Sequence, residues 1–418
     1  MNVLVIGSGG REHTICWALS KSPKVDKIYC LPGNGGISQI AECVPISVMD
    51  FDAIVDFVDT HKDVELTVVA PDDPLAAGLV DRLNEKGHRA FGPKANAAII
   101  EASKVFSKYL MKKYGIPTAD YEEFQDYEKA VEYLSKAKYP LVVKADGLAL
   151  GKGVIICNNV EEGLQAAKDM MIDSKFKEAG KTVIVEEFMT GQEVSILSFC
   201  DGKTIVPMVN ARDHKRAYDN DEGLNTGGMG TFSPSAIYTP EIEKEVMDNI
   251  ILPTVEAMNK EGRTFKGVLY FGLMLTADGA KVVEYNARFG DPETQVVLPR
   301  LKTDLLDIFN AVVDGTLDKM NIEWTDDACV CVVMASGGYP ESYEKGKEIA
   351  IGELDEDILL FHAGTKIENG KLLTNGGRVL GVTALGKNID EARQKAYANV
   401  KKIKFDGAFF RSDIGIKK

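Results

Sequence analysis

The segment from Val282 to Thr294 combines residue types that could hold a metal ion beside a reacting group. It begins as an apolar strand and ends in a Phe-Gly-Asp-Pro turn. Alternation along a strand places Glu284, Asn286 and Arg288 on one face. A carboxylate and an amide oxygen two residues apart are hard ligands of the kind that Mg²⁺ prefers. We predict that Glu284 and Asn286 bind the metal and that Arg288 binds a carboxylate or phosphoryl group. The alternative is the polar outer face of a half-buried strand.

A glycine-rich stretch from Lys144 to Gly153 lies between two predicted strands. It contains three glycines and a second lysine, Lys152. Glycine lets main-chain amides approach anionic oxygens, and a lysine adds positive charge. The stretch therefore indicates a loop that closes over a triphosphate, with Lys144 as a fixed counter-charge. For this motif alone, an ordinary hairpin with an exposed lysine is the alternative.

The first predicted strand is followed directly by the sequence Gly-Ser-Gly-Gly-Arg-Glu-His at residues 7–13. Such a turn ahead of a helix presents unpaired N–H groups and the positive end of a dipole, which favour a phosphate. A dinucleotide fingerprint needs glycine at the sixth position of Gly-x-Gly-x-x-Gly, where this chain has Glu12. The pattern favours a monophosphate site over a nicotinamide site, and a tight turn without a ligand stays open.

Two polar segments between these motifs indicate ligand binding. Residues 186–193, Glu-Glu-Phe-Met-Thr-Gly-Gln-Glu, read as a strand end and a turn that would present backbone groups to an adenine and acids to ribose hydroxyls. Taken singly, these acids are more often solvated surface. The loop from Asp213 to Gly230 is polar and basic, then glycine-rich, and too long for a plain connection. We therefore expect it to bind a substrate.

The first of the elements that must position these motifs is an open parallel α/β sheet. Apolar runs at residues 3–6, 27–31 and 66–70, each followed by a Gly or Pro turn, predict its strands. A lysine-rich helix over 101–114 follows and ends at Gly115-Ile116-Pro117, which combines the usual helix-stopping residues. A unit boundary is therefore expected near residue 117.

Further apolar runs predict three more units. A small α+β lid would have strands at 140–145, 153–157 and 182–187 and a helix over 160–171. A larger core would have strands at 193–199 and 204–209, a long helix, and a hairpin at 267–286. A strand over 328–335 and a helix over 390–401 predict a C-terminal α+β unit. The expected units are residues 1–117, 118–190, 191–325 and 326–418 of a mixed α/β and α+β multidomain chain.

Composition limits the class of protein further. The 418 residues exceed the roughly 250–300 at which one core stops growing. The net charge of −14 argues against a nucleic-acid surface, which needs clustered Lys and Arg. No segment is apolar enough to suggest a membrane span, and the first residues lack the pattern of a secretory signal. The seven cysteines are scattered without paired metal spacing, so we expect a cytoplasmic protein with reduced core thiols.

In their order along the chain, these motifs resemble the ATP-grasp superfamily, in which two α+β lobes hold ATP. The strings at 7–13, 144–154, 225–230 and 284–295 also resemble those of the phosphoribosylamine–glycine ligase family; the last two read Asn-Thr-Gly-Gly-Met-Gly and Glu-Tyr-Asn-Ala-Arg-Phe-Gly-Asp-Pro-Glu-Thr-Gln. The resemblance implies a two-lobed ATP-grasp core between the N-terminal sheet and the C-terminal unit. It implies an ATP-dependent ligase of purine synthesis that activates glycine as an acyl phosphate and joins it to phosphoribosylamine, with ATP as cosubstrate and Mg²⁺ or Mn²⁺ as cofactor.

The resemblance also implies roles for individual residues. Those that would bind ATP are Lys104, Lys144, Gly151, Lys152, Gly153, Glu186, Glu187, Phe188 and Glu193. Those that would bind phosphoribosylamine, glycine and the acyl phosphate are Gly9, Gly10, Arg11, Asp72, Asp213, Asn225, Thr226, Gly227, Gly228, Met229, Gly230 and Arg288. Catalysis would rest on Lys144, Asp213 and Arg288, and the metal on Glu284 and Asn286.

Two positions depart from the pattern of these families. Residues 70–75 read Ala-Pro-Asp-Asp-Pro-Leu where the ligase family has Gly-Pro-Glu-x-Pro-Leu, so Asp72 is one methylene shorter. Residues 270–273 lack the carboxylate that many ATP-grasp enzymes place opposite the metal strand, which leaves the number of metal ions open. The alternatives are an ATP-grasp purine enzyme that uses bicarbonate or formate, and a non-catalytic nucleotide-binding module. The expected partners are small molecules, and the choice between monomer and homodimer stays open.

Overall fold

The computed structural model describes residues 1–148, 153–173, 175 and 177–416. Its N-terminal part is a five-stranded, all-parallel sheet in the order β3-β2-β1-β4-β5, which confirms the predicted α/β sheet. The strands are β1 (Asn2–Gly7), β2 (Lys27–Pro32), β3 (Glu42–Cys43), β4 (Val64–Val69) and β5 (Ala90–Phe91). The helices are α1 (Gly10–Ser20), α2 (Phe51–Thr60), α3 (Asp72–Ala76) and α4 (Leu79–Glu85). Because both faces of a parallel sheet are covered, residues 3–6 of β1 are fully buried.

The helix predicted over 101–114 is two helices. α5 (Ala95–Ala102) and α6 (Lys104–Tyr114) meet at Ser103, whose extended backbone breaks the helical run. Its side chain accepts the N–H of Phe106 at 3.1 Å and so caps α6, a role for which serine is well suited. Gly115 ends α6 in the left-handed conformation, at φ 69°, as the predicted stop requires.

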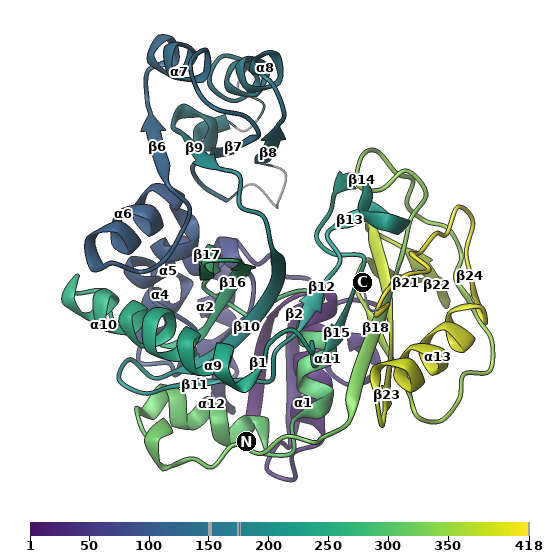
Figure 1. Cartoon of the computed structure of the whole chain (residues 1–418). Helices are drawn as coiled ribbons and strands as arrows, with labels where there is room; N and C mark the ends of the chain where they lie inside the picture. The colour runs from purple at the N-terminus through teal and green to yellow at the C-terminus, as the bar shows by residue number, and fades with distance from the viewer. Residues whose placement is uncertain (149–152, 174, 176, 417–418) are drawn as a thin grey trace.

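The lid is an antiparallel sheet in the order β6-β9-β7-β8 with its helices on one side, and Figure 1 shows it standing above the rest of the chain. Its elements are β6 (Tyr121–Phe124), α7 (Tyr127–Leu134), β7 (Leu141–Ala145), β8 (Val154–Cys157), α8 (Val160–Met171) and β9 (Val183–Glu187). Three strands and α8 match the predicted ranges closely. β6 and α7 were not predicted from the sequence.

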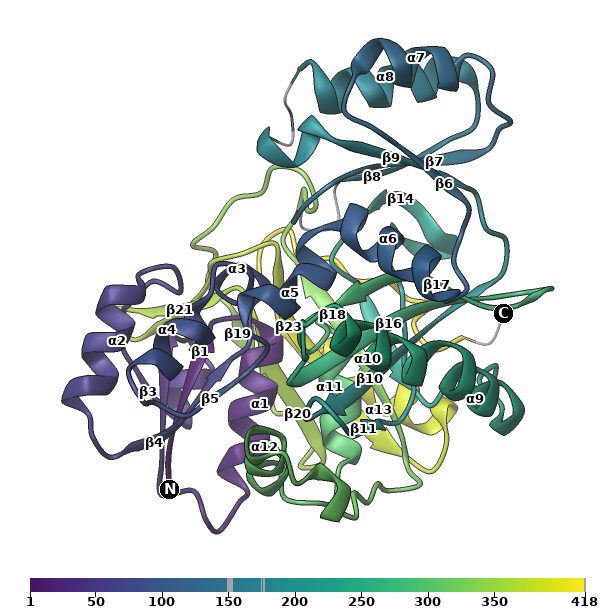
Figure 2. The ribbon, with the colours of Figure 1, turned by 90° about the vertical axis from the view of Figure 1, so that its left-hand side faces the viewer.

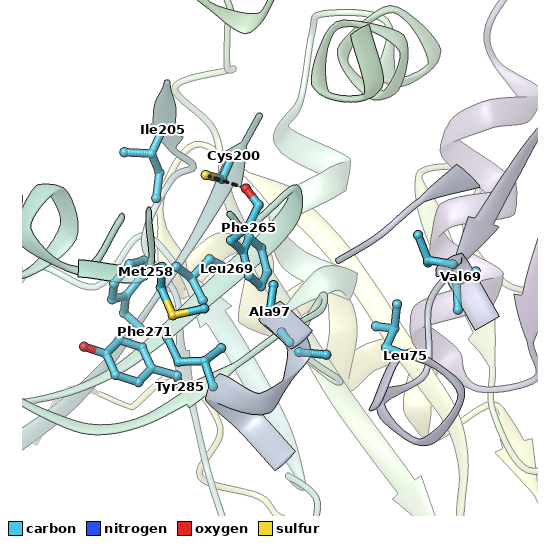
Figure 3. Close-up of a cluster of buried hydrophobic side chains, with 14 of the residues drawn as sticks. Val69, Leu75, Ala97, Cys200, Ile205, Met258, Phe265, Leu269, Phe271 and Tyr285 are labelled. Atoms are coloured by element: carbon cyan, nitrogen blue, oxygen red, sulfur yellow. Dashed lines mark hydrogen bonds between the residues drawn. The ribbon is translucent and has the colours of Figure 1, made fainter. Parts of the chain in front are cut away.

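The core sheet has the order β11-β10-β16-β17 and ends in the predicted hairpin. Its strands are β10 (Gln192–Cys200), β11 (Ile205–Pro207), β16 (Gly267–Thr276) and β17 (Gly279–Asn286). The predicted long helix is α9 (Pro240–Val246), a π-helical turn over Met247–Ile251, and α10 (Leu252–Lys260); α11 (Thr294–Val297) and α12 (Leu305–Asp314) follow the hairpin. Figure 3 shows Met258 of α10 beside Phe265 and beside Leu269 and Phe271 of β16, in one buried cluster. The strand β17, which carries Glu284 and Asn286, therefore belongs to a sheet that packs against α10.

A second five-stranded sheet joins residues from two parts of the chain in the order β12-β15-β18-β23-β20. Its strands are β12 (Arg212–Asp213), β15 (Gly230–Ser233), β18 (Ala328–Ala335), β20 (Ile358–His362) and β23 (Arg378–Gly386), with α13 (Ile389–Val400) packed against it. Smaller pairs are β13 (Arg216–Tyr218) with β14 (Glu222–Asn225), β19 (Ala350–Ile351) with β24 (Ile403–Lys404), and β21 (Thr365–Glu368) with β22 (Lys371–Thr374). Thr231 lies opposite Cys331, so hydrogen bonding crosses the boundary expected at 325/326, and the division into four units stays a proposal.

The turn at the C-terminal end of β1 lies beside residues from the other end of the chain. Figure 2, in which the N-terminal sheet lies at the left, shows α1 next to β20 and β23. α1 contacts β20 and α11 directly. Within the described part of the chain, no helix is long and apolar enough to cross a lipid bilayer.

Candidate active site

Glu284 and Asn286 lie on β17 and have the chemistry expected of metal ligands. Burial alone raises the pKa of Glu284, but Lys215, Lys144 and Lys104 outweigh it and hold that pKa below its usual value. The carboxylate is therefore ionised. The amide oxygen of Asn286 accepts a hydrogen bond from Arg288 at 3.1 Å. One anionic and one neutral hard oxygen suit a divalent cation such as Mg²⁺, which usually keeps several water ligands. Among the described residues there is no group of three or more His, Cys, Asp or Glu that could hold an ion.

Lys144 on β7 forms a buried ion pair with Glu186 on β9, and a third residue joins them. Nζ of Lys144 lies 2.9 Å from Oε2 of Glu186, and Nζ of Lys108 on α6 lies 3.2 Å from the same oxygen. The three side chains are only 3–7% exposed. The carboxylate of Glu186 therefore faces two lysines rather than an open adenine pocket. Lys108 was missed in the sequence, although its spacing of four from Lys104 places both on one helix face.

The predicted phosphate and adenine residues surround this pair. Lys104 donates to the main-chain oxygen of Gly147 at 2.8 Å, and burial lowers its pKa although Glu284 pulls the other way. Glu187 pairs with Lys281 at 3.3 Å, and Phe188 is 39% exposed at the hinge after β9. Gly153 leads into β8, whereas Gly151 and Lys152 lie outside the described residues.

A buried acidic group holds Arg288. Nη2 of Arg288 lies 2.9 Å from Oε1 of Glu101 and 3.9 Å from Oδ2 of Asp72. Burial raises the pKa of Glu101, whereas Arg288 and Arg11 hold the pKa of Asp72 below its usual value against the effect of burial. Among the described residues Nε of Arg288 is buried without a hydrogen-bond partner. The arginine is thus fixed by its neighbours while one donor is left for a ligand.

The glycine turn after β1 is already partly filled by carboxylates. Glu12 accepts the N–H of Gly9 and Nε of Arg11, both at 2.6 Å. The N–H of Arg11 donates to Asp291 at 3.3 Å. Glu12, which stands where the dinucleotide fingerprint needs glycine, is 2% exposed and accepts a main-chain N–H at the start of α1. The predicted phosphate residues Gly9, Gly10 and Arg11 lie beside the 284–295 segment, close to Asp291.

Arg378 on β23 connects the 225–230 loop to the same segment. Its Nη1 donates to the main-chain oxygens of Gly227 at 2.6 Å and Asp291 at 2.7 Å, and lies 3.4 Å from a carboxylate oxygen of Asp291. Gly228 has φ 111°, and a Cβ there would lie 2.4 Å from Pro292, so the loop needs glycine at that position. Arg378 was not predicted from the sequence, because an isolated arginine 87 residues from Asp291 carries no local signal.

Asp213 and Lys215 are two ionisable residues at the start of the 213–230 loop. Burial raises the pKa of Asp213 to about 8, against the opposing effect of Lys215 and with the help of Glu293 and Glu193. Lys215 pairs with Glu193 at 2.8 Å and approaches Glu284 at 3.8 Å. Burial lowers the pKa of Lys215, but these acids outweigh it and raise that pKa well above its usual value. The side chain predicted to meet ribose, Glu193, is therefore engaged by Lys215 in this structure.

Comparison with known families covers most of the chain. Residues 1–101 match the N domain of phosphoribosylglycinamide synthetase, residues 102–294 its ATP-grasp (A) domain, and residues 329–417 its C domain. A phosphoribosylamine–glycine ligase from Halalkalibacterium halodurans is 50% identical over all of this chain and 97% of its own length. One from Caldanaerobacter subterraneus is 48% identical over 99% of both chains.

Solved structures agree with these matches. A phosphoribosylamine–glycine ligase from Thermotoga maritima is 37% identical, with a TM-score of 0.87 over 99% of this chain and 100% of its own. The biotin carboxylase domain of Hydrogenobacter thermophilus 2-oxoglutarate carboxylase, solved with MgADP and bicarbonate, shares the fold at 16% identity. Its TM-score is 0.74 over 98% of this chain and 91% of its own.

Proposed function

The chain belongs to the phosphoribosylglycinamide synthetase family, and we propose how its residues divide the work of that family's reaction. It is an ATP-dependent ligase that joins glycine to phosphoribosylamine in purine biosynthesis. The observation that carries this function is the match of all three family domains together with full-length relatives that are about half identical. Because enzymes of purine biosynthesis are typically cytoplasmic, we propose a cytoplasmic location for this one.

The reaction proceeds in two steps. A carboxylate oxygen of glycine attacks the γ-phosphorus of ATP, forming glycyl phosphate and releasing ADP. The amine of phosphoribosylamine then attacks the glycyl carbon, the C–O bond to phosphate breaks, and phosphate and one proton leave. Phosphoryl transfer needs alignment and neutralisation of charge more than covalent help. Lys104 and Lys144, whose charges act on the ionised Glu284, would bind the polyphosphate, and Arg288 would bind the glycine carboxylate or its phosphate.

Glu284 and Asn286 would hold Mg²⁺, or Mn²⁺ in its place. When bound, the ion would neutralise charge on the phosphate oxygens and help to align them. The support is the ionised state of Glu284 and the adjacent amide oxygen of Asn286 on one strand face. Arg288 donates to that oxygen now, and it would give the contact up to an ion.

The 213–230 loop would bind the amine substrate. A pKa of about 8 lets Asp213 exchange a proton near neutral pH, which suits a group that takes the proton from the attacking amine. Residues 225–230 and Gly9 to Arg11 converge on Asp291, which accepts from the N–H of Arg11 and from Gln295 and faces Arg378. Such a site between the N-terminal turn and the loop would hold the ribose phosphate. Asp72, which lies 3.9 Å from Arg288, would also contact the substrate.

The deciding experiment follows ADP release with ATP, Mg²⁺ and phosphoribosylamine generated in place, with and without glycine. Release that depends on glycine, with a product of the mass of glycinamide ribonucleotide, is the expected result. Release that depends on bicarbonate or formate instead would keep the ATP-grasp chemistry but replace the substrate. No nucleotide turnover with any carboxylate would leave a binding module only.

A further inference from the structure

We propose that Lys108 is a positioning residue that holds the carboxylate of Glu186, so that Lys144 is released to bind the polyphosphate of the nucleotide. The proposal rests on the function above, because it explains how one residue of its ATP site becomes available. It concerns nucleotide affinity, which is measured without glycine or amine.

The two lysines that share Glu186 are anchored unequally. Lys108 also donates to Oγ1 of Thr118 at 2.8 Å and to the main-chain oxygen of Ala119 at 3.2 Å. Among the described residues, the further hydrogen bond of Lys144 is a longer one of 3.4 Å to the oxygen of Val283. Lys108 is therefore fixed on three sides, and Lys144 is the lysine that can turn away at little cost.

The charges of Lys108, Lys144 and Glu186 also indicate that Lys108 stays with Glu186 while Lys144 is released. One buried carboxylate faces two ammonium groups, so the cluster carries excess positive charge before any ligand arrives. Burial lowers the pKa of Lys108 to about 8, against the opposing effect of Glu186 and with the help of Lys144. Tyr121, whose ring centroid lies 5.6 Å from Nζ of Lys108, and Glu187 complete its surroundings. A polyphosphate that draws Lys144 away would thus leave a matched Lys108–Glu186 pair behind.

Without Lys108 the same movement would be unfavourable. Of the cations paired with Glu186 in the described part of the chain, Lys144 alone would remain beside a carboxylate that is 3% exposed, and its departure would create an unpaired buried charge. Lys144 would then stay with Glu186, and the nucleotide would lose a cation. Lys108 itself needs no contact with the nucleotide for this effect, which separates its role from that of Lys104.

The test uses Lys108→Met, Glu186→Gln and the double variant in the full chain, with affinity for MgADP measured by calorimetry. Lys108→Met should weaken affinity by about tenfold, because the charged pair then holds Lys144. In the Glu186→Gln background the same change should alter affinity by less than about threefold, since the carboxylate that traps Lys144 is gone. Lys112→Met is the matched control, because it removes an exposed lysine from the same helix.

Equal loss on removing Lys108 in both backgrounds would overturn the proposal, and so would parental affinity in Lys108→Met. If Lys108→Met fails to fold, Lys108→Gln, which can still donate to Thr118 and Ala119 but carries no charge, replaces it in both backgrounds. Steady-state rates add a second readout: KM for ATP should rise while KM for glycine does not. A chain that binds MgADP as described but releases no ADP on adding glycine would contradict the ligase function and leave this inference standing.

Discussion

Nη1 of Arg378 lies 2.6 Å from the main-chain oxygen of Gly227, and this contact ties the C-terminal sheet to the loop proposed to hold the amine substrate. The same nitrogen reaches the main-chain oxygen of Asp291 at 2.7 Å. A planar guanidinium can serve several acceptors at fixed angles, whereas a lysine is a flexible point charge. Arg378 therefore fixes two loops relative to each other.

Arg378→Lys should lower kcat/KM for phosphoribosylamine by about 10- to 100-fold, because misplacing a binding loop by an ångström is costly. KM for ATP should change by less than about threefold, since the lysine cluster lies elsewhere. Steady-state kinetics with each substrate varied in turn would measure both. Arg393→Lys is the control, because Arg393 also donates to carbonyl oxygens but at the chain end, in Ser412 and Ile414. An equal rise in KM for ATP would contradict the assignment.

Arg288→Ala should lower turnover by orders of magnitude while nucleotide affinity stays close to that of the parent. The change also leaves Glu101 buried without its cation, a loss of about 3–5 kcal/mol in the free energy of unfolding. Arg288→Ala with Glu101→Gln removes both charges and should recover much of that stability without recovering turnover. Chemical denaturation and single-turnover rates separate the two effects. A matching loss of nucleotide affinity would refute the role given to Arg288.

Glu284→Gln should raise the Mg²⁺ concentration for half-maximal activity by about tenfold or more, because an anionic ligand becomes neutral. The measurement is a Mg²⁺ titration of ADP release at fixed total ATP. Glu243→Gln, an exposed carboxylate on α9, should leave the titration unchanged. If Glu284→Gln requires the same Mg²⁺ concentration as the parent, Glu284 is not a metal ligand and the metal site does not lie on β17.

Acid should destabilise the chain through His13. Its Nδ1 accepts the N–H of His362 at 2.7 Å, and burial, followed by His362, lowers its pKa to about 3. The unfolded histidine titrates near 6.5, so the unfolded chain takes up a proton first, and stability falls as pH drops from about 6.5 towards 3. The loss at pH 4 is on the order of 3 kcal/mol. His13→Asn, which keeps an acceptor but does not titrate, should lose less between pH 7 and pH 4 in denaturant titrations. Identical losses would contradict this.

Much of this arrangement could be predicted from local patterns. The parallel sheet, α8 and the β16–β17 hairpin follow from short-range periodicity and turn residues, and the 284–295 segment follows from residue type and spacing. Ser103 separates α5 from α6 through its own cap, which the lysine-rich pattern concealed. Lys108 and Arg378 matter because of partners 78 and 151 residues away. The spacing of four between Lys104 and Lys108 indicates a shared helix face, but no neighbour in sequence of Lys108 or Arg378 identifies the distant partner.

The sheet order β12-β15-β18-β23-β20 has a consequence for any attempt to divide the chain into working fragments. A piece starting at residue 326 would lack the strand that pairs with β18, leaving a fully buried eight-residue strand with one bare edge. Bare apolar edges recruit other chains and aggregate. The segment before it would in turn lose the template on which residues 230–233 pair. The two fragments would therefore have to be produced together. Their assembly would depend on pairing of β15 from one fragment with β18 from the other.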